Sequence, residues 1–107
     1  MKERLEDFEY KEVIDMKREE FERALSLSKM NVGQIESLRK FFSLQHDIMQ
    51  QQVVALNKLL NDKENPLDSE KRAQADKTVE QLFLIMFSLE YKATLLYERA
   101  KKLLKGS

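Results

Sequence analysis

Apolar side chains recur at helical spacing through the middle of the chain. Between residues 34 and 61 they form a stripe within about 60° at 100° per residue. The stripe consists of Ile35, Leu38, Phe42, Met49, Val53, Leu56 and Leu60. Phe41, Ile48 and Leu59 widen this face, whereas Asp47 and Lys58 lie away from it. The pattern predicts an amphipathic helix over 32–62.

A longer apolar pattern follows, with alternating steps of four and three residues. Its members are Ala75, Val79, Leu82, Met86, Leu89, Ala93, Leu96, Ala100 and Leu103. This heptad spacing is typical of a helix that packs along its length, as in a coiled coil. We therefore predict a third helix over 66–104.

The first segment is the most charged part of the chain, with fifteen charged residues among the 22 from Lys2 to Arg23. Its apolar residues divide between two faces of a helix. One set is Tyr10, Ile14, Phe21 and Leu25, and the other is Leu5, Phe8, Met16 and Leu27. Because helix formers dominate and no Gly or Pro precedes Asn31, we predict a helix over 2–29 with a split apolar face.

Two short segments separate these helices. Asn31 as N-cap with Gln34 three residues later forms a capping box, and Met30 and Ile35 have the spacing of a hydrophobic staple. Asn65 followed by Pro66 is typical of an N-cap and first helical residue. The chain is thus predicted to be all-α, with three long antiparallel helices in one elongated bundle domain spanning 1–107. Two Gly and one Pro are too few for the turns of a sandwich or barrel.

Charge balance argues against several classes of partner. Lys and Arg total 19, and Asp and Glu also total 19, whereas nucleic-acid binders usually carry a basic surplus. The longest apolar run, Leu82 to Phe87, has six residues, and about 20 are needed to cross a bilayer. Residues 1–4 lack the apolar stretch of a signal peptide. We expect a soluble, cytoplasmic protein without membrane insertion or nucleic-acid binding.

The C-terminal end combines basic and apolar residues. Lys101, Lys102 and Lys105 stand beside Leu103 and Leu104. Such a cluster complements the partial negative charge of a helix C-terminus, which is the interpretation we favour. The alternative is a short basic amphipathic end that lies on a membrane surface.

No pattern in the chain is typical of a catalytic, metal or cofactor site. His46 is the only histidine, and Ser43 occupies the position where a Glu-x-x-His diiron motif requires Glu. There is no Cys, no Gly-rich phosphate loop and no Gly-x-Ser-x-Gly motif. We expect His46 to be a half-packed residue at the edge of the apolar stripe. The sequence predicts no enzyme activity, no cofactor, no metal and no small-molecule substrate.

Two glutamines, Gln45 and Gln52, lie seven residues apart near the centre of the wide apolar face. Their amides either reach water from the rim of that face or form a buried polar layer. A buried layer would set the helix register or oligomeric state, as polar residues at core heptad positions can. Both interpretations remain open at this point.

The third helix also carries a second apolar stripe, away from its heptad seam. The stripe consists of Leu84, Phe87, Tyr91 and Leu95, with Phe83 between the two faces. A helix that is apolar on two sides must be covered on two sides. The first and second helices could each cover one side in a closed bundle; otherwise the stripe binds a helical partner.

These features favour a non-enzymatic protein–protein interaction module. We expect it to self-associate or to pair with a helical protein partner, as adaptors, export partners and chaperones of this shape do. The candidate partner-binding residues are Phe83, Leu84, Phe87, Tyr91 and Leu95, and the candidate register-setting residues are Gln45 and Gln52. The alternative is a regulator, such as an antitoxin or phage-encoded inhibitor, that occludes a target protein.

Overall fold

The computed structural model describes residues 2–106, and every regular element in that range is helical. Met1 and Ser107, the two ends of the predicted domain, lie outside the described residues. The elements are listed in chain order: a 3₁₀ turn η1 (Leu5–Asp7), α1 (Tyr10–Asp15), α2 (Arg18–Leu27), α3 (Val32–Leu60) and α4 (Ser69–Lys105). The prediction of an all-α protein is confirmed.

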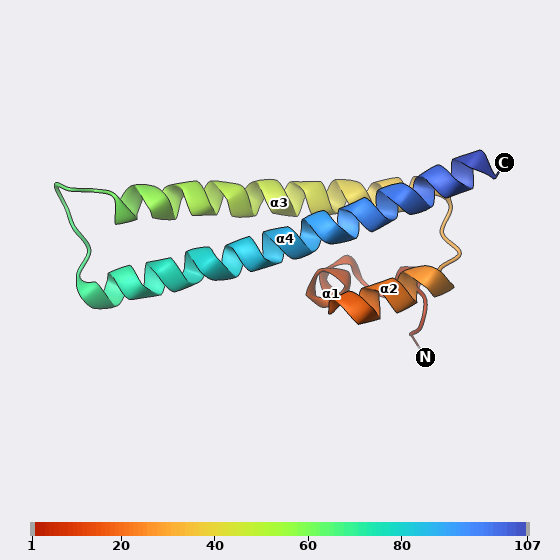
Figure 1. The fold of residues 1–107 in the computed structure, drawn as a ribbon, viewed down its shortest axis with the longest axis horizontal. Helices are drawn as coiled ribbons and strands as arrows, with labels where there is room; N and C mark the ends of the chain where they lie inside the picture. Colours follow the sequence, from red (N-terminus) through yellow and green to blue (C-terminus); the bar gives the residue numbers. More distant parts are fainter. Residues whose placement is uncertain (1, 107) are drawn as a thin grey trace.

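The long helices α3 and α4 form an antiparallel hairpin that sets the length of the molecule (Figure 1). The structure measures 59 × 27 × 17 Å along its principal axes. Asn31 caps α3 as predicted, since its side-chain oxygen accepts from Gln34 N at 2.8 Å and its own N–H donates to the Gln34 side chain at 2.9 Å. The predicted helices over 32–62 and 66–104 therefore exist, with small differences at their ends.

The start of α4 differs from the prediction. Asn65 does not cap a helix: Asp62 Oδ1 accepts from Glu64 N at 3.0 Å and from Asn65 N at 3.2 Å. This Asx-type turn uses the segment that we expected to enter the helix. The N-cap is instead Asp68, whose side chain accepts from Lys71 N at 2.8 Å.

The prediction of one continuous helix over 2–29 is wrong. Phe8 and Glu9 are extended, and so are Met16 and Lys17, with ψ between 139° and 158°. These breaks divide the segment into η1, α1 and α2, which we call the N-terminal cover. A single straight helix would bury only one of the two apolar sets, whereas the breaks let each piece turn its own apolar residues inward. Leu5, Val13, Met16 and Phe21 are all buried as a result.

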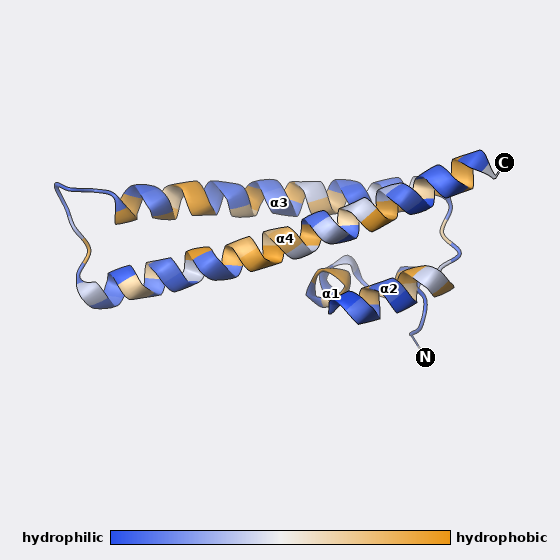
Figure 2. Ribbon diagram, in the orientation of Figure 1, coloured by the Kyte–Doolittle hydropathy of each residue, from blue (hydrophilic) through white to orange (hydrophobic). Residues whose placement is uncertain are grey.

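The N-terminal cover packs on only one end of the hairpin (Figure 1). The continuous core contains apolar residues from the cover and from the adjacent ends of α3 and α4. Its buried hairpin members are Ile35, Leu38, Phe42, Leu89, Leu96 and Ala100. We call residues 32–42 and 89–105 the covered half of the hairpin, and residues 43–60 and 69–88 the open half. Figure 2 shows that the hydrophobic stretch of α4 continues past α1 toward the loop end.

Basic side chains of α4 bond to the C-terminal carbonyls of the three preceding α-helices. Arg72 donates to Leu60 O at the end of α3 (2.9 Å), and Arg99 donates to Ser28 O at the end of α2 (3.1 Å). Lys92 Nζ donates to the carbonyls of Val13 and Ile14, in the last turn of α1, at 3.0 and 2.8 Å. Carbonyls at a helix C-terminus lack intrahelical partners and carry partial negative charge, so cations satisfy them well.

Lys92 is the most deeply placed of these cations, with 1% of its surface exposed. Burial lowers the pKa of its ammonium group, and the negative charges of Asp15 and Glu20 act against that shift. Its ammonium also lies 5.8 Å from the centre of the Phe21 ring. Lys92 therefore joins α1, α2 and α4, and its bonds to α1 help to hold the cover at this end of the hairpin.

Candidate protein-docking face

The predicted second stripe of α4 crosses the boundary between the two halves of the hairpin. At the covered end, Tyr91 is half-buried: its hydroxyl donates to Glu22, and the Arg18 guanidinium lies 4.1 Å from its ring centre. Leu95 is half-buried and packs against the core. In a single chain, therefore, α2 covers Tyr91, and Leu95 belongs to the packed end of the stripe.

At the open end, the same stripe is exposed to solvent. Leu84 is 68% exposed and Phe87 is 60% exposed. Phe83 is also exposed, and its ring stacks on that of Phe87 with centres 6.2 Å apart. Large apolar side chains scattered singly on a surface are ordinary, but neighbouring ones form a patch that indicates an interaction site.

Helix α3 adds apolar residues to the same side of the hairpin. Phe41 marks the side that α1 covers, because its ring lies 5.0 Å from that of Tyr10. Ile48 and Leu59 follow Phe41 by seven and eighteen residues, which returns them to nearly the same direction at about 100° per residue. On α4, Leu84 precedes Leu95 by eleven residues, so these two side chains also point in nearly the same direction. Ile48 and Leu59 are both exposed, as is Leu44.

We call this surface the open face. Its apolar members are Leu44, Ile48 and Leu59 from α3 and Leu84 and Phe87 from α4. The sequence singled out Leu84 and Phe87 and placed Ile48 and Leu59 on a wide apolar face, but it gave no indication that Leu44 takes part. In the covered half, the N-terminal cover packs on one side of the hairpin. The open face is the same side of the hairpin in the open half.

The two candidate register-setting glutamines lie on this face as well. Gln45 is half-buried and Gln52 is exposed. Within one chain, therefore, Gln52 reaches water, and a buried amide layer would require a second molecule on the face. The register hypothesis remains a prediction about an assembly.

The centre of the open face contains few charges. Asp47 is the only Asp, Glu, Lys or Arg between residues 41 and 57, and residues 81–89 contain none. Asp47 points about 120° away from the line of Phe41 at 100° per residue. Depletion of charge together with exposed aromatic and aliphatic side chains is the composition of an interface centre.

His46 lies on the other side of the hairpin. Its Nε2 lies 3.0 Å from Glu90 Oε1, a contact that joins α3 to α4. Both line a shallow groove of about 280 Å³ together with Arg39, Ser43 and residues of the hairpin seam. His46 is half-buried beside Phe42, which agrees with its expected place at the edge of the stripe.

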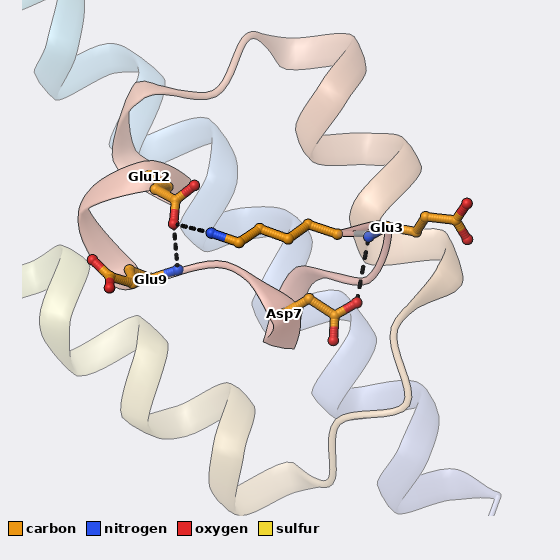
Figure 3. Close-up of polar contacts among 5 residues, drawn as sticks. Glu3, Asp7, Glu9 and Glu12 are labelled. Carbon is orange, nitrogen blue, oxygen red and sulfur yellow. Dashed lines mark hydrogen bonds and ion pairs between the residues drawn. The ribbon is translucent and has the colours of Figure 1, made fainter.

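The charged contacts of the N-terminal cover lie within the cover itself and are exposed to solvent. Glu12 accepts from the Lys2 ammonium at 2.8 Å and from Glu9 N at 3.2 Å, and Asp7 accepts from the backbone N–H of Glu3 (Figure 3). Asp7 also accepts from Arg4 N at 3.0 Å. The Lys2 ammonium holds the pKa of Glu12 below its ordinary value, and the two N–H donors do the same for Asp7. The backbone bonds cap the N-termini of η1 and α1, and all of these contacts favour the ionised carboxylates.

Comparisons with protein-family models, curated proteins and solved structures found no match to this chain. Across residues 2–106, no helix combines the length and apolar character needed to cross a membrane. In the same range, His, Asp and Glu side chains do not gather in threes or more where they could hold a metal ion.

Proposed function

We propose that this chain is a non-enzymatic protein–protein interaction module that binds through its open face. The observation that carries the proposal is the unequal covering of the hairpin. One side of α3 and α4 is packed under the N-terminal cover at one end, and at the other end it presents exposed Leu84, Phe87 and Ile48. An adaptor, export-partner or chaperone role fits this mode of binding.

The covered half indicates the kind of occupant that the open face accepts. Helix α2 lies against α4, with Glu22 and Arg18 on Tyr91. Leu84 and Phe87 continue the stripe beyond Tyr91, so a helix of a partner could pack there in the same manner. This is the helix-in-groove mode, in which an amphipathic helix places its apolar face against an apolar surface.

The expected binding energy is concentrated in a few side chains. Completely burying a Leu or Phe side chain is favourable by about 1.5–3 kcal/mol, and Leu84 and Phe87 have most of that burial still to gain. Such residues at the centre of an interface act as hot spots, and the surrounding polar residues mainly exclude water. Leu84 and Phe87 are therefore the first residues to alter.

The test is affinity capture from the source cells, comparing the wild type with a Leu84→Asp/Phe87→Asp double variant. The matched control is Leu104→Asp, because Leu104 is on the same helix, is 62% exposed and lies at the opposite end. We expect the double variant to keep its helical circular dichroism and to lose captured partners, including untagged copies of the chain. If the folded double variant retains every partner of the wild type, the proposed function is wrong.

A further inference from the structure

We propose that the occupant of the open face is the open face of a second copy of this chain, packed antiparallel about a two-fold axis. This inference rests on the proposed function and names its partner. The pairing would set α3 against α3 and α4 against α4 of the second copy. Four helices would then enclose the apolar residues that one hairpin leaves exposed.

The chemistry of the open face is self-complementary. In a two-fold interface the groups on the axis face their own copies, so charged residues there would face like charges. Around the axis the open face contains apolar side chains and glutamines, and Asp47, the one charge between residues 41 and 57, points away from it. On α4 the nearest charges in the direction of Leu84, Glu80 and Lys77, lie four and seven residues from it. The amide of Gln52 suits this position, because an amide both donates and accepts and can pair with an identical amide.

The N-terminal cover determines the direction of packing. It forms a third layer on the same side of the hairpin as the open face, but only at the covered end. In a parallel arrangement the two covers would meet and hold the open faces apart by roughly two helix diameters of about 10 Å each. In the antiparallel arrangement, the open half of each copy lies beside the cover of the other, and the faces touch.

The register follows from the limits of the open half. On α3 the face runs from Leu44 to Leu59, so its midpoint lies next to Gln52. A residue at the midpoint of an antiparallel two-fold pair lies opposite its own copy. Helix α4 runs antiparallel to α3, with Glu90 beside His46 and Arg72 beside Leu60, so Leu84 lies near the same level as Gln52. We place Gln52 and Leu84 close to the axis.

The available area fits a modest dimer. Residues 43–60 of α3 extend about 27 Å at 1.5 Å per residue, and two packed helices are about 20 Å wide. The projected face is thus about 500 Å² per copy, and side-chain relief raises the accessible area above that figure. Two copies together approach the lower limit of about 1,200 Å² for specific interfaces, which corresponds to reversible association rather than an obligate dimer.

Sedimentation equilibrium of the full chain tests the partner. We expect a concentration-dependent dimer for the wild type, and a dissociation constant raised about tenfold or more by Leu84→Glu, which places two carboxylates at the axis. Leu104→Glu should leave the dimer unchanged. A wild type that stays monomeric at high concentration, or a dimer unaffected by Leu84→Glu, overturns the second copy as occupant. A capture result that still depends on Leu84 and Phe87 would then leave the proposed function intact.

Cysteine substitution tests the register, because the natural chain contains no Cys. We expect Gln52→Cys to form an intermolecular disulfide under mild oxidation, since it faces its own copy. The matched control is Gln50→Cys, an exposed glutamine of the same helix that points away from the open face. Crosslinking of Gln50→Cys as fast as Gln52→Cys contradicts the proposed face. Rapid crosslinking of Lys63→Cys, in the loop between α3 and α4, contradicts the antiparallel direction.

Discussion

The covered and open halves of the hairpin use the same two helices but differ in what lies on one side. In the covered half, Phe42, Leu89 and Leu96 are each at most 1% exposed and belong to one continuous core. In the open half, the buried apolar residues Val53, Ala75 and Met86 lie in the seam between α3 and α4 and outside that core.

The difference shows what a third layer contributes. Two helices can bury only the seam between them, whereas a third element also covers the adjacent faces. Both halves have apolar residues on the side where that layer belongs: Leu95 and Phe41 at one end, Leu84 and Ile48 at the other. The open half therefore has the surface of a three-layer bundle without the third layer.

Two phenylalanines, one in each half of the hairpin, should differ most in their contribution to the free energy of unfolding. Replacing Phe42 by Ala removes a fully buried ring and should lower the free energy of unfolding by about 3–5 kcal/mol. Replacing the exposed Phe87 by Ala should change it by about 0.5 kcal/mol or less in the monomer. Urea unfolding at low protein concentration measures both. Equal losses for the two variants would refute the distinction between the halves.

Lys92→Met tests how the cover is held. The substitution leaves the Val13 and Ile14 carbonyls without their ammonium donor, so we expect a loss of about 2 kcal/mol. The cover should also detach more often, which hydrogen exchange would show as faster exchange of amides in α1 and α2. Lys71→Met, an exposed lysine of the same helix that points away from the open face, is the control. Unchanged exchange of the cover in Lys92→Met would mean that these bonds do not fasten it.

The two helix N-caps offer a contrast between the ends of the hairpin. Asn31→Ala removes the capping box of α3 in the covered half and should lower global stability by about 1 kcal/mol. Asp68→Ala removes the equivalent bond at the start of α4 in the open half. Because that end has few buried contacts, we expect local fraying with a smaller global effect. Thermal unfolding with NMR of residues 69–73 distinguishes the two effects, and a larger global loss from Asp68→Ala would contradict the account.

Acid should loosen the cover before the hairpin. The pKa values of Asp7 and Glu12 lie below their ordinary values of 3.8 and 4.5, so their stabilisation is present above those values and lost as pH falls through the lowered ones. Each exposed contact contributes little, so the effect is the smallest of the series. As the pH is lowered, NMR titration should show amides of residues 2–16 shifting before those of the α3–α4 seam. The difference between the two regions should be smaller in Glu12→Gln. If the cover and the hairpin lost their structure at the same pH, this order would be wrong.

The hairpin could be predicted well from the sequence, because the patterns that specify its two helices are local. The heptad pattern of α4 and the capping box at Asn31 each depend on residues a few positions apart. The start of α4 was misplaced because Asp62 and Asn65 compete for the same turn, and propensity does not reveal which side chain accepts the backbone N–H groups.

The N-terminal segment could not be predicted in the same way. The break after α1 frees carbonyls that Lys92 satisfies from 78 and 79 residues away, and no local pattern records such a partner. The breaks also determine how much of the hairpin the N-terminal segment covers. A continuous helix over 2–29 would extend about 42 Å and could have covered both halves, whereas α1 and α2 are only six and ten residues long. Exposure of the open face therefore follows from a feature that the sequence pattern did not reveal.

Hydrogen exchange measured at several protein concentrations tests the central claim most directly. We predict that amides of residues 43–60 and 69–88 exchange faster than those of the covered half in dilute protein. Their protection should then rise with concentration, while that of the covered half remains constant. A concentration-independent pattern, or equal protection of the two halves in dilute solution, would contradict an open face that a second copy covers.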